Sequence, residues 1–307
     1  MFACIWFFKF LSYHHIWHDI RYHKRKIKSI KESLDKATSK DTPEDDPKDK
    51  ELSDITSSLG NKLEDVSKYP SNIKAYDVWM FCLIPTLCFQ LKYPYNERGS
   101  VVNFVYRLIE SAISTIIWVT IFAEFSIPLV ELIVSDIKNQ DYLNALYNFM
   151  KLSVPNTYGW LFQFYLGFHA YLNAWAELTG FADKNFYDDW WNSKTLGEYW
   201  RKWNLPVHHW MTRHLYFPMR RRKISRGVAM VLVFTFSAIL HEYMLAGCFG
   251  VITLIGFNGM MAQLPVIMIQ DKFKRFFGGQ IGNIFFWIFF CVIGQPSGMV
   301  VVYYVLA

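Results

Sequence analysis

The sequence carries little charge for its length and has no cysteine pairing pattern. Asp, Glu, Lys and Arg make up 19% of the 307 residues, whereas hydrophobic residues make up 52%. Soluble domains contain about 25% charged residues, so this composition argues against a soluble globular protein. The five cysteines are scattered through apolar stretches without a CxxC pair, which argues for buried thiols rather than a disulfide framework or a zinc site.

Several catalytic motifs are also absent. There is no GxxxxGK[ST], no GxGxxG and no GxSxG, so a P-loop nucleotide site, a Rossmann cofactor site and a serine-hydrolase elbow are excluded. No secretory signal is recognisable, because the apolar residues 1–12 have neither a basic region before them nor a small-residue cleavage site after them. We interpret residues 1–20 as the end of a truncated membrane helix.

What the chain does have is aromatic and apolar sequence. Aromatic residues make up 19%, and Trp and Tyr favour membrane–water interfaces. Long apolar segments predict an all-α, polytopic membrane helical bundle. A bilayer core of about 30 Å requires about 20 apolar residues per helix, and five segments are long enough: residues 112–134, 158–179, 228–248, 250–269 and 283–306.

Basic residues predict the orientation of these segments. The net charge is +6, and the positive residues cluster beside apolar segments, which points to anionic lipid or an anionic ligand rather than nucleic acid. If the five spans alternate, the clusters fall on one side, which the positive-inside rule makes cytosolic, and the C-terminus is lumenal. The clusters comprise Arg21, Lys24, Arg25 and Lys26; Lys92, Arg98 and Arg107; Arg220, Arg221, Arg222, Lys223 and Arg226; and Lys272, Lys274 and Arg275.

Two segments differ from the spans. Residues 21–70 are rich in Lys, Asp, Glu and Ser, and are interpreted as a polar cytosolic linker. Residues 180–226 form an amphipathic cytosolic segment in which Trp200, Trp203, Val207 and Trp210 recur at helical spacing. This segment is either a helix resting in the headgroup layer or a lid that binds an anionic, adenine-bearing ligand, and periodicity cannot distinguish the two.

The third span contains the candidate chemistry. His241 can exchange a proton near neutral pH, and Ser237 shares its helix face and could orient the imidazole. Ionisable groups in membrane helices are costly and are functional candidates by default, although Ser237, His241 and Glu242 could also simply join helices. The run that starts at His241 has Leu245 where a zinc protease has its second His, so no metal site is expected. For His169 we favour a structural role.

Gln263 and Gln295 are further polar residues inside spans. They could form hydrogen bonds between helices, or line a cavity around His241 and donate to a carbonyl.

Three runs together resemble one family. Residues 186–192, FYDDWWN, resemble the FYxDWWN signature of the diacylglycerol and sterol acyltransferase branch of the membrane-bound O-acyltransferases. Residues 241–243, HEY, resemble that family's catalytic-histidine segment. Residues 203–208 and 213–219, WNLPVH and RHLYFPM, resemble the diacylglycerol type, as do residues 259–265. The similarity extends from about residue 69 to the end, so residues 71–307 correspond to the catalytic region.

The resemblance implies transfer of a fatty acyl group from acyl-CoA to the hydroxyl of 1,2-diacylglycerol, giving triacylglycerol at the endoplasmic reticulum membrane. It implies a reaction chamber within the membrane, acyl-CoA as a substrate with no cofactor, and a homo-oligomer for the full-length protein. Sterol or long-chain-alcohol acyl transfer is the alternative within the enzyme class. A catalytically incomplete lipid-binding fragment is the alternative outside it, because family members have further membrane helices before the matched region.

The resemblance also implies roles for residues. His241 would be the general base, acting with Asn204 and supported by Glu242, Ser237, Gln263 and Gln295. Trp203, His208, Tyr216 and Arg226 match positions that border the acyl-CoA entrance, and the signature comprises Phe186, Tyr187, Asp189, Trp190, Trp191 and Asn192. Independently, His241 lies about 20 Å along the helix from the basic cluster, at 1.5 Å per residue, and the pantetheine arm of CoA has a similar length.

Overall fold

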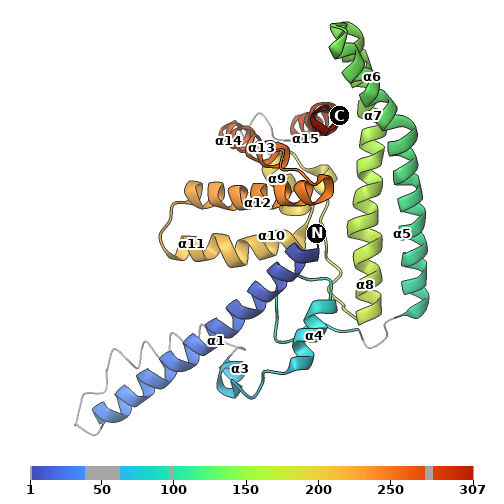
Figure 1. Cartoon of the computed structure of the whole chain (residues 1–307). Coiled ribbons are helices and arrows are strands. Elements are labelled where there is room, and N and C mark those ends of the chain that lie inside the picture. Colours follow the sequence, from blue (N-terminus) through green and yellow to red (C-terminus); the bar gives the residue numbers. More distant parts are fainter. Residues whose placement is uncertain (1, 39–62, 97–99, 274–278, 307) are drawn as a thin grey trace. The chain divides into compact units, whose positions relative to one another are not determined.

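A computed structural model describes residues 2–38, 63–96, 100–273 and 279–306 (Figure 1). The described residues are helical apart from turns and one isolated antiparallel bridge between Tyr95 and Phe181. The chain divides into two compact units, residues 2–93 and 94–307. The expected all-α class is confirmed.

The first unit is built on α1 (Phe2–Thr38), against which α3 (Leu63–Lys68) and α4 (Ala75–Leu83) pack. The helix α1 continues well past residue 20, where the sequence suggested a linker; residues 39–62 of that linker lie outside the described residues. Tertiary packing explains the extra length, because the buried Ile20 and Ile30 continue the apolar face of α1 beyond the membrane-like segment.

A buried lysine joins α1 to α4. The ammonium of Lys9 donates to the carbonyl oxygens of Phe81 (2.6 Å), Cys82 (3.1 Å) and Ile84 (2.6 Å). Carbonyl groups at a helix C-terminus have no intrahelical donor, and a cation is favourable there. The hydroxyl of Ser12, one turn further along α1, accepts from the backbone N–H of Phe89. These bonds fix the apolar segment after α4 against α1.

The second unit begins with a long antiparallel hairpin (Figure 1). Its first arm runs through α5 (Val101–Ile121), a π-helical turn η2 (Phe122–Ser126) and α6 (Ile127–Lys138). Its second arm runs through α7 (Tyr142–Phe164), η3 (Tyr165–Tyr171) and α8 (Leu172–Thr179). Asp141 caps α7 by accepting from the backbone N–H of Asn144, and Gly180 ends α8 with a φ of 69° that suits glycine.

A short connecting region follows the hairpin. It contains η4 (Trp190–Asn192), α9 (Leu196–Lys202), α10 (Leu205–Met211), η5 (Thr212–Tyr216) and α11 (Phe217–Arg221). The expected single helical face is interrupted, because Asn204 breaks the helix and caps α10. Trp210 is fully buried, and Trp203 stacks between Trp160 and Tyr199, so these rings serve the protein core rather than a headgroup layer.

The remaining helices are α12 (Arg226–Phe249), α13 (Ile255–Met261), α14 (Gln263–Lys272), α15 (Gly279–Trp287), η6 (Ile288–Gly294) and α16 (Gln295–Leu306). Within the described residues, three helices are long and apolar enough to cross a membrane: Val101–Lys138, Arg226–Phe249 and Gln280–Leu306. They contain the expected spans 112–134, 228–248 and 283–306. The expected span 158–179 lies in the second arm of the hairpin, which is long enough but more polar.

The expected span 250–269 is wrong as a single helix. Residues 250–254 form a turn, and α13 and α14 are separated at Ala262. The two short helices contact α12 and α9, and Met260, Leu264 and Ile267 are their buried apolar residues. The membrane orientation was derived from five spans that cross in alternation, and it therefore stays a prediction.

One aromatic cluster holds the second unit together around the candidate site. Its buried members come from four separate parts of the chain and are Phe164, Trp190, Leu196, Tyr199, Ile267, Phe286 and Phe290. The Phe164 and Trp190 rings meet edge-to-face with centroids 4.9 Å apart, and Phe286 and Phe290 are stacked at 23°. The cluster therefore ties α7 and α9 to α14 and α15.

Replacing Lys9 by Met tests the α1–α4 joint. The substitution keeps the apolar stem but leaves three carbonyl oxygens without their charged donor, so we expect a loss of about 2–3 kcal/mol in the free energy of unfolding. The midpoint of thermal unfolding in detergent would measure it. Lys28→Met is the control, because Lys28 is exposed and its ion pair within the described residues is a surface pair with Glu32 at 3.7 Å. An equal loss in both variants would contradict the assignment.

Candidate active site around His241

His241 lies in α12, about 22 Å along the helix from Arg226 at 1.5 Å per residue. Its Nδ1 is 2.8 Å from the backbone oxygen of Ser237 and 3.5 Å from the Ser237 hydroxyl. A carbonyl oxygen can only accept, so Nδ1 carries the proton in this contact and Nε2 holds the lone pair. The backbone of Ser237, more than its hydroxyl, therefore orients the half-buried imidazole and leaves Nε2 as its basic nitrogen.

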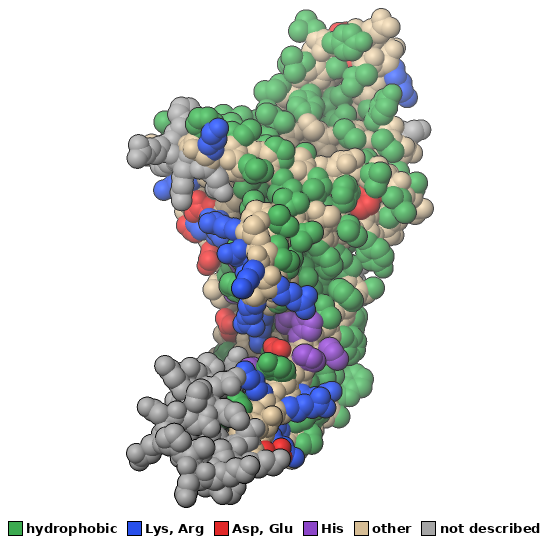
Figure 2. All heavy atoms as spheres, turned by 90° about the vertical axis from the view of Figure 1, so that its left-hand side faces the viewer, with side chains coloured by type: hydrophobic (Ala, Val, Ile, Leu, Met, Phe, Trp, Pro, Cys, Tyr) green, Lys and Arg blue, Asp and Glu red, His purple; other side chains and the backbone are tan. Residues whose placement is uncertain are grey.

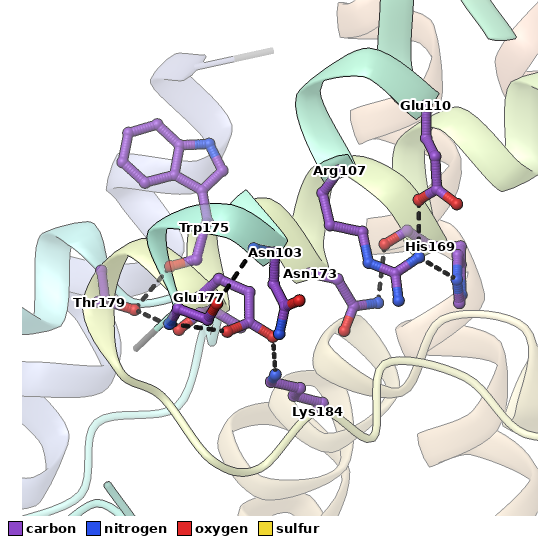
Figure 3. A network of polar contacts seen from close by, with 11 residues as sticks. Asn103, Arg107, Glu110, His169, Asn173, Trp175, Glu177, Thr179 and Lys184 are labelled. Carbon is purple, nitrogen blue, oxygen red and sulfur yellow. Dashed lines mark hydrogen bonds and ion pairs between the residues drawn. The ribbon is translucent and has the colours of Figure 1, made fainter. Parts of the chain in front are cut away.

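His169 provides an internal comparison (Figure 3). Its Nε2 is 3.0 Å from a guanidinium nitrogen of Arg107, and its Nδ1 is 2.8 Å from the hydroxyl of Tyr187. Arg107 also pairs with Glu110 at 2.6 Å. Both ring nitrogens of His169 are thus engaged in a satisfied network between η3 and α5, as the favoured structural role predicts. His241 differs because its hydrogen bonds within the described residues involve Nδ1.

Glu242, the next residue, is 6% exposed and makes an anchor. Its carboxylate accepts from the backbone N–H groups of Thr253 (2.7 Å), Leu254 (2.7 Å), Gly256 (3.0 Å) and Phe257 (3.3 Å). A buried carboxylate is tolerated in apolar surroundings when its oxygens are hydrogen-bonded in this way. The sequence left open whether Glu242 tunes His241 or joins two helices, and these contacts support the second role.

Gly256 allows the close approach of α13 to α12. A Cβ at this position would lie 3.0 Å from the backbone carbon of His241 and 3.1 Å from the backbone nitrogen of Glu242. Backbone atoms yield less readily than a flexible side chain, so any other residue would push α13 away from α12. Thus the turn that Glu242 binds is pressed against the part of α12 that carries His241.

Trp200 links His241 to Gln263. The indole of Trp200 donates to Oε1 of Gln263 at 2.9 Å. The same indole meets the His241 ring edge-to-face, with centroids 6.3 Å apart and planes at 88°. The sequence analysis treated Trp200 only as part of a tryptophan face. The sequence could not predict this contact of Trp200, because its two partners are 41 and 63 positions away along the chain.

The other predicted residues of the site are distributed more widely. Asn204 caps α10 by accepting from the backbone N–H of Val207 at 3.2 Å, which is a structural task. Gln295 begins α16, a helix that contacts α13. The described contacts do not join Asn204 or Gln295 to His241, so their catalytic roles stay predictions.

The residues predicted to bind acyl-CoA are spread along the connecting region and the start of α12, and no described contact joins them to one another. Trp203 belongs to the aromatic stack, and His208 lies half-buried on α10. Burial, with His209 and Arg201 nearby, lowers the pKa of His208, so it is neutral at pH 7. Tyr216 ends η5, and the exposed Arg226 begins α12. Exposed Lys and Arg side chains are visible in Figure 2. Within the second unit, the connecting region ends in the exposed basic run Arg220–Lys223.

The signature at residues 186–192 acts as a clamp. The backbone carbonyl of Phe186 accepts from the backbone N–H of Leu205 at 3.0 Å. The backbone N–H of Asp188 donates to the backbone carbonyl of Lys202 at 2.8 Å. The ammonium of Lys202 lies 2.8 Å from Asp189 and lowers the pKa of that carboxyl. The signature therefore fixes both ends of the α9–α10 junction.

The same signature also holds α15. The carbonyl of Trp191 accepts from the side chains of Asn283 and Trp287 at 2.9 and 3.0 Å. Trp190 is 1% exposed within the aromatic cluster, and Asn192 donates to Asp189 at 3.4 Å. The bonds to Phe186, Asp188 and Trp191 use backbone atoms, whereas the side chains of Asp189 and Trp190 contact α9 and α15 through Lys202, Tyr199 and Trp287.

A depression at the start of α7 is unrelated to this site. It is open, apolar and lined by Leu143, Asn144, Leu146, Tyr147 and Met150, whose side chains are mostly well exposed. None of these lining residues is acidic, basic or a histidine.

Removing the Glu242 carboxylate should destabilise the site. Glu242→Ala leaves several backbone N–H groups of the 253–257 turn without an acceptor, and we expect a loss of at least about 3 kcal/mol. Glu242→Gln should lose less, because it keeps one acceptor oxygen. Thermal unfolding in detergent measures both variants. Glu131→Ala is the matched control, because Glu131 is also in a span but is exposed, and its hydrogen bond among the described residues comes from Tyr303. Equal effects at the two positions would overturn the anchoring role.

Gly256→Ala tests the close helix contact. The added methyl group requires α13 to move away from α12, at a cost of about 1–3 kcal/mol. Gly259→Ala, in the same short helix, has open space around its Cβ and should leave the unfolding midpoint unchanged or slightly raised. Similar midpoints for the two variants would show that the contact is not tight.

Comparison with known proteins identifies the family of the chain. Residues 2–305 match the profile of the MBOAT, membrane-bound O-acyltransferase, family. The chain is 37% identical over 308 residues to diacylglycerol O-acyltransferase 1 of Corylus americana, covering 99% of this chain and 51% of that protein. Diacylglycerol O-acyltransferase 1A of Glycine max is 35% identical, over 99% of this chain and 55% of that protein. Diacylglycerol O-acyltransferase 1 of Arabidopsis thaliana is 40% identical over 227 residues, which are 73% of this chain and 43% of that protein. The chain spans about half the length of these relatives, and it belongs to the membrane-bound O-acyltransferase family.

Proposed function

We propose that the protein transfers a fatty acyl group from acyl-CoA to the free hydroxyl of 1,2-diacylglycerol, giving triacylglycerol. The observation that carries this proposal is the orientation of His241 within a membrane-spanning helix, with Nδ1 on the Ser237 carbonyl and Nε2 as the basic nitrogen. The names of the relatives support the choice of acceptor. No cofactor is required for this reaction, because acyl-CoA is itself the activated substrate.

In this mechanism Nε2 of His241 accepts the proton of the acceptor hydroxyl. The hydroxyl oxygen then attacks the thioester carbonyl carbon, so that a C–O bond forms and the C–S bond breaks. The proton passes from His241 to the departing CoA sulfur. The carbonyl oxygen gains negative charge during the attack and needs a hydrogen-bond donor, a role for which Gln263 and Gln295 are the candidates.

The substrates also fit the charge distribution. Acyl-CoA has a polyanionic head and an apolar tail, so its site should join a basic surface to the interior of the membrane. The exposed Arg220–Lys223 run and Arg226 precede the helix that carries His241. We propose that this run lies on the cytosolic side of the endoplasmic reticulum membrane, with the C-terminus lumenal, around a chamber that contains His241, and that the full-length protein forms a homo-oligomer.

Triacylglycerol synthesis in microsomes from cells that lack their own activity tests the proposal. We expect product with the wild-type chain and a loss of at least about 100-fold in His241→Ala, because a general base contributes 10²–10⁴-fold. His18→Ala is the control, since His18 is exposed on α1, and expression should be matched by immunoblot.

Labelled acyl-CoA supplied with diacylglycerol, a sterol or a long-chain alcohol in turn distinguishes the alternatives. Preferential transfer to the sterol or alcohol would replace the acceptor in the proposal. Binding of acyl-CoA without turnover would instead favour a lipid-binding fragment.

A further inference from the structure

Trp200 is the one residue that contacts both His241 and Gln263 among the described contacts of the site. It lies on α9, half-buried, and its ring packs edge-to-face on Phe234 of α12, with centroids 6.4 Å apart. It also meets Trp203 at 85°. Contacts with Phe234 and Trp203 therefore fix the orientation of the indole independently of its contacts with His241 and Gln263.

The contact with Gln263 selects one orientation of an amide. An indole N–H can only donate, so the atom of Gln263 that faces Trp200, at 2.9 Å, must be the oxygen. The amide nitrogen is then directed away from the indole. A flipped amide would place two donors against each other and is disfavoured.

The amide nitrogen of Gln263 remains available to a substrate. Its contacts are the carbonyl oxygen of Gly259 at 3.4 Å and the sulfur of Met260 at 3.9 Å. Both distances are at the outer limit for hydrogen bonds, so neither holds the N–H groups strongly. A carbonyl oxygen that gains negative charge would be a better acceptor than either.

We propose that Trp200 is a positioning residue for acyl transfer: its N–H fixes the Gln263 amide so that the amide nitrogen is presented to the thioester carbonyl, while its ring restrains the His241 imidazole. This inference rests on the proposed function and names a device within the same site. In the reaction, the hydroxyl oxygen bonds to the carbonyl carbon, the proton moves to Nε2 of His241 and then to sulfur, and CoA departs. Gln263 donates only a hydrogen bond.

Trp200→Phe is the informative variant, because it keeps an aromatic ring beside His241 and Phe234 but removes the N–H. We expect kcat to fall about 10-fold while KM for acyl-CoA changes less than 3-fold. The control is Trp118→Phe, because the buried indole nitrogen of Trp118 has no hydrogen-bond partner within the described residues; it should leave kcat unchanged.

A double-mutant cycle with Gln263→Ala separates positioning from a general structural role. If Trp200 acts through Gln263, Trp200→Phe should lower kcat little further once the amide is gone. If the two single losses multiply instead, Trp200 does not act through Gln263 and the proposal is overturned. The unfolding midpoint of each variant identifies any that lose activity by misfolding.

A measurement without turnover keeps this inference separate from the proposed function. In protein labelled with ¹⁵N-tryptophan, the Trp200 indole signal is assigned by its loss in Trp200→Phe. We expect Gln263→Ala to shift this signal and to speed its hydrogen exchange, whereas Gln263→Glu, which retains an acceptor, should preserve protection. An unchanged indole signal in Gln263→Ala overturns the contact. A wild-type protein that shows the contact but no acyl transfer overturns its catalytic use together with the proposed function.

Discussion

The burial of one carboxylate determines how the candidate site is built. Glu242 lies within an apolar helix, where an unpaired charge would cost several kcal/mol. Backbone N–H groups of the turn before α13 satisfy it, and they can do so only if α13 approaches the segment of α12 that contains Glu242. Because His241 is the neighbouring residue, the same requirement places α13 beside the candidate base, at the glycine contact of Gly256.

The consequences extend along the chain from this anchor. The helix α13 leads directly into α14, which begins at Gln263. Gln263 meets Trp200 of α9, and α9 is held in turn by the aromatic cluster and by Lys202, whose ammonium lies 2.8 Å from both Asp189 and Glu198. The signature motif therefore supports the site indirectly, by holding the helix that carries Trp200. Its aromatic and acidic letters fix α9 and α15, and the base itself lies on another helix.

Polar residues in the spans divide into two kinds. Arg107, Glu110 and His169 are satisfied by one another and by the hydroxyl of Tyr187, which lies outside the helices, so the cost of these polar groups is offset locally and they serve packing. Among the described contacts, His241 is hydrogen-bonded through Nδ1, which leaves the Nε2 lone pair that a general base needs. The sequence alone ranked His241 above His169 because of its neighbours, and the hydrogen bonds supply the physical distinction.

The sequence by itself determined the membrane class, the helical architecture, the three spans that the structure contains and the candidate base, because hydropathy over about 20 residues and an ionisable group within it are local properties. Local patterns could not determine which partner a buried face would meet. The helix expected over residues 200–210 breaks because Asn204 caps α10. The span expected over residues 250–269 is shortened at its start because Glu242 binds the turn at residues 253–257, so that α13 begins only at Ile255. The roles of Glu242 and Trp200 depend on residues 11–15 and 41–63 positions away, and only tertiary packing decides such contacts.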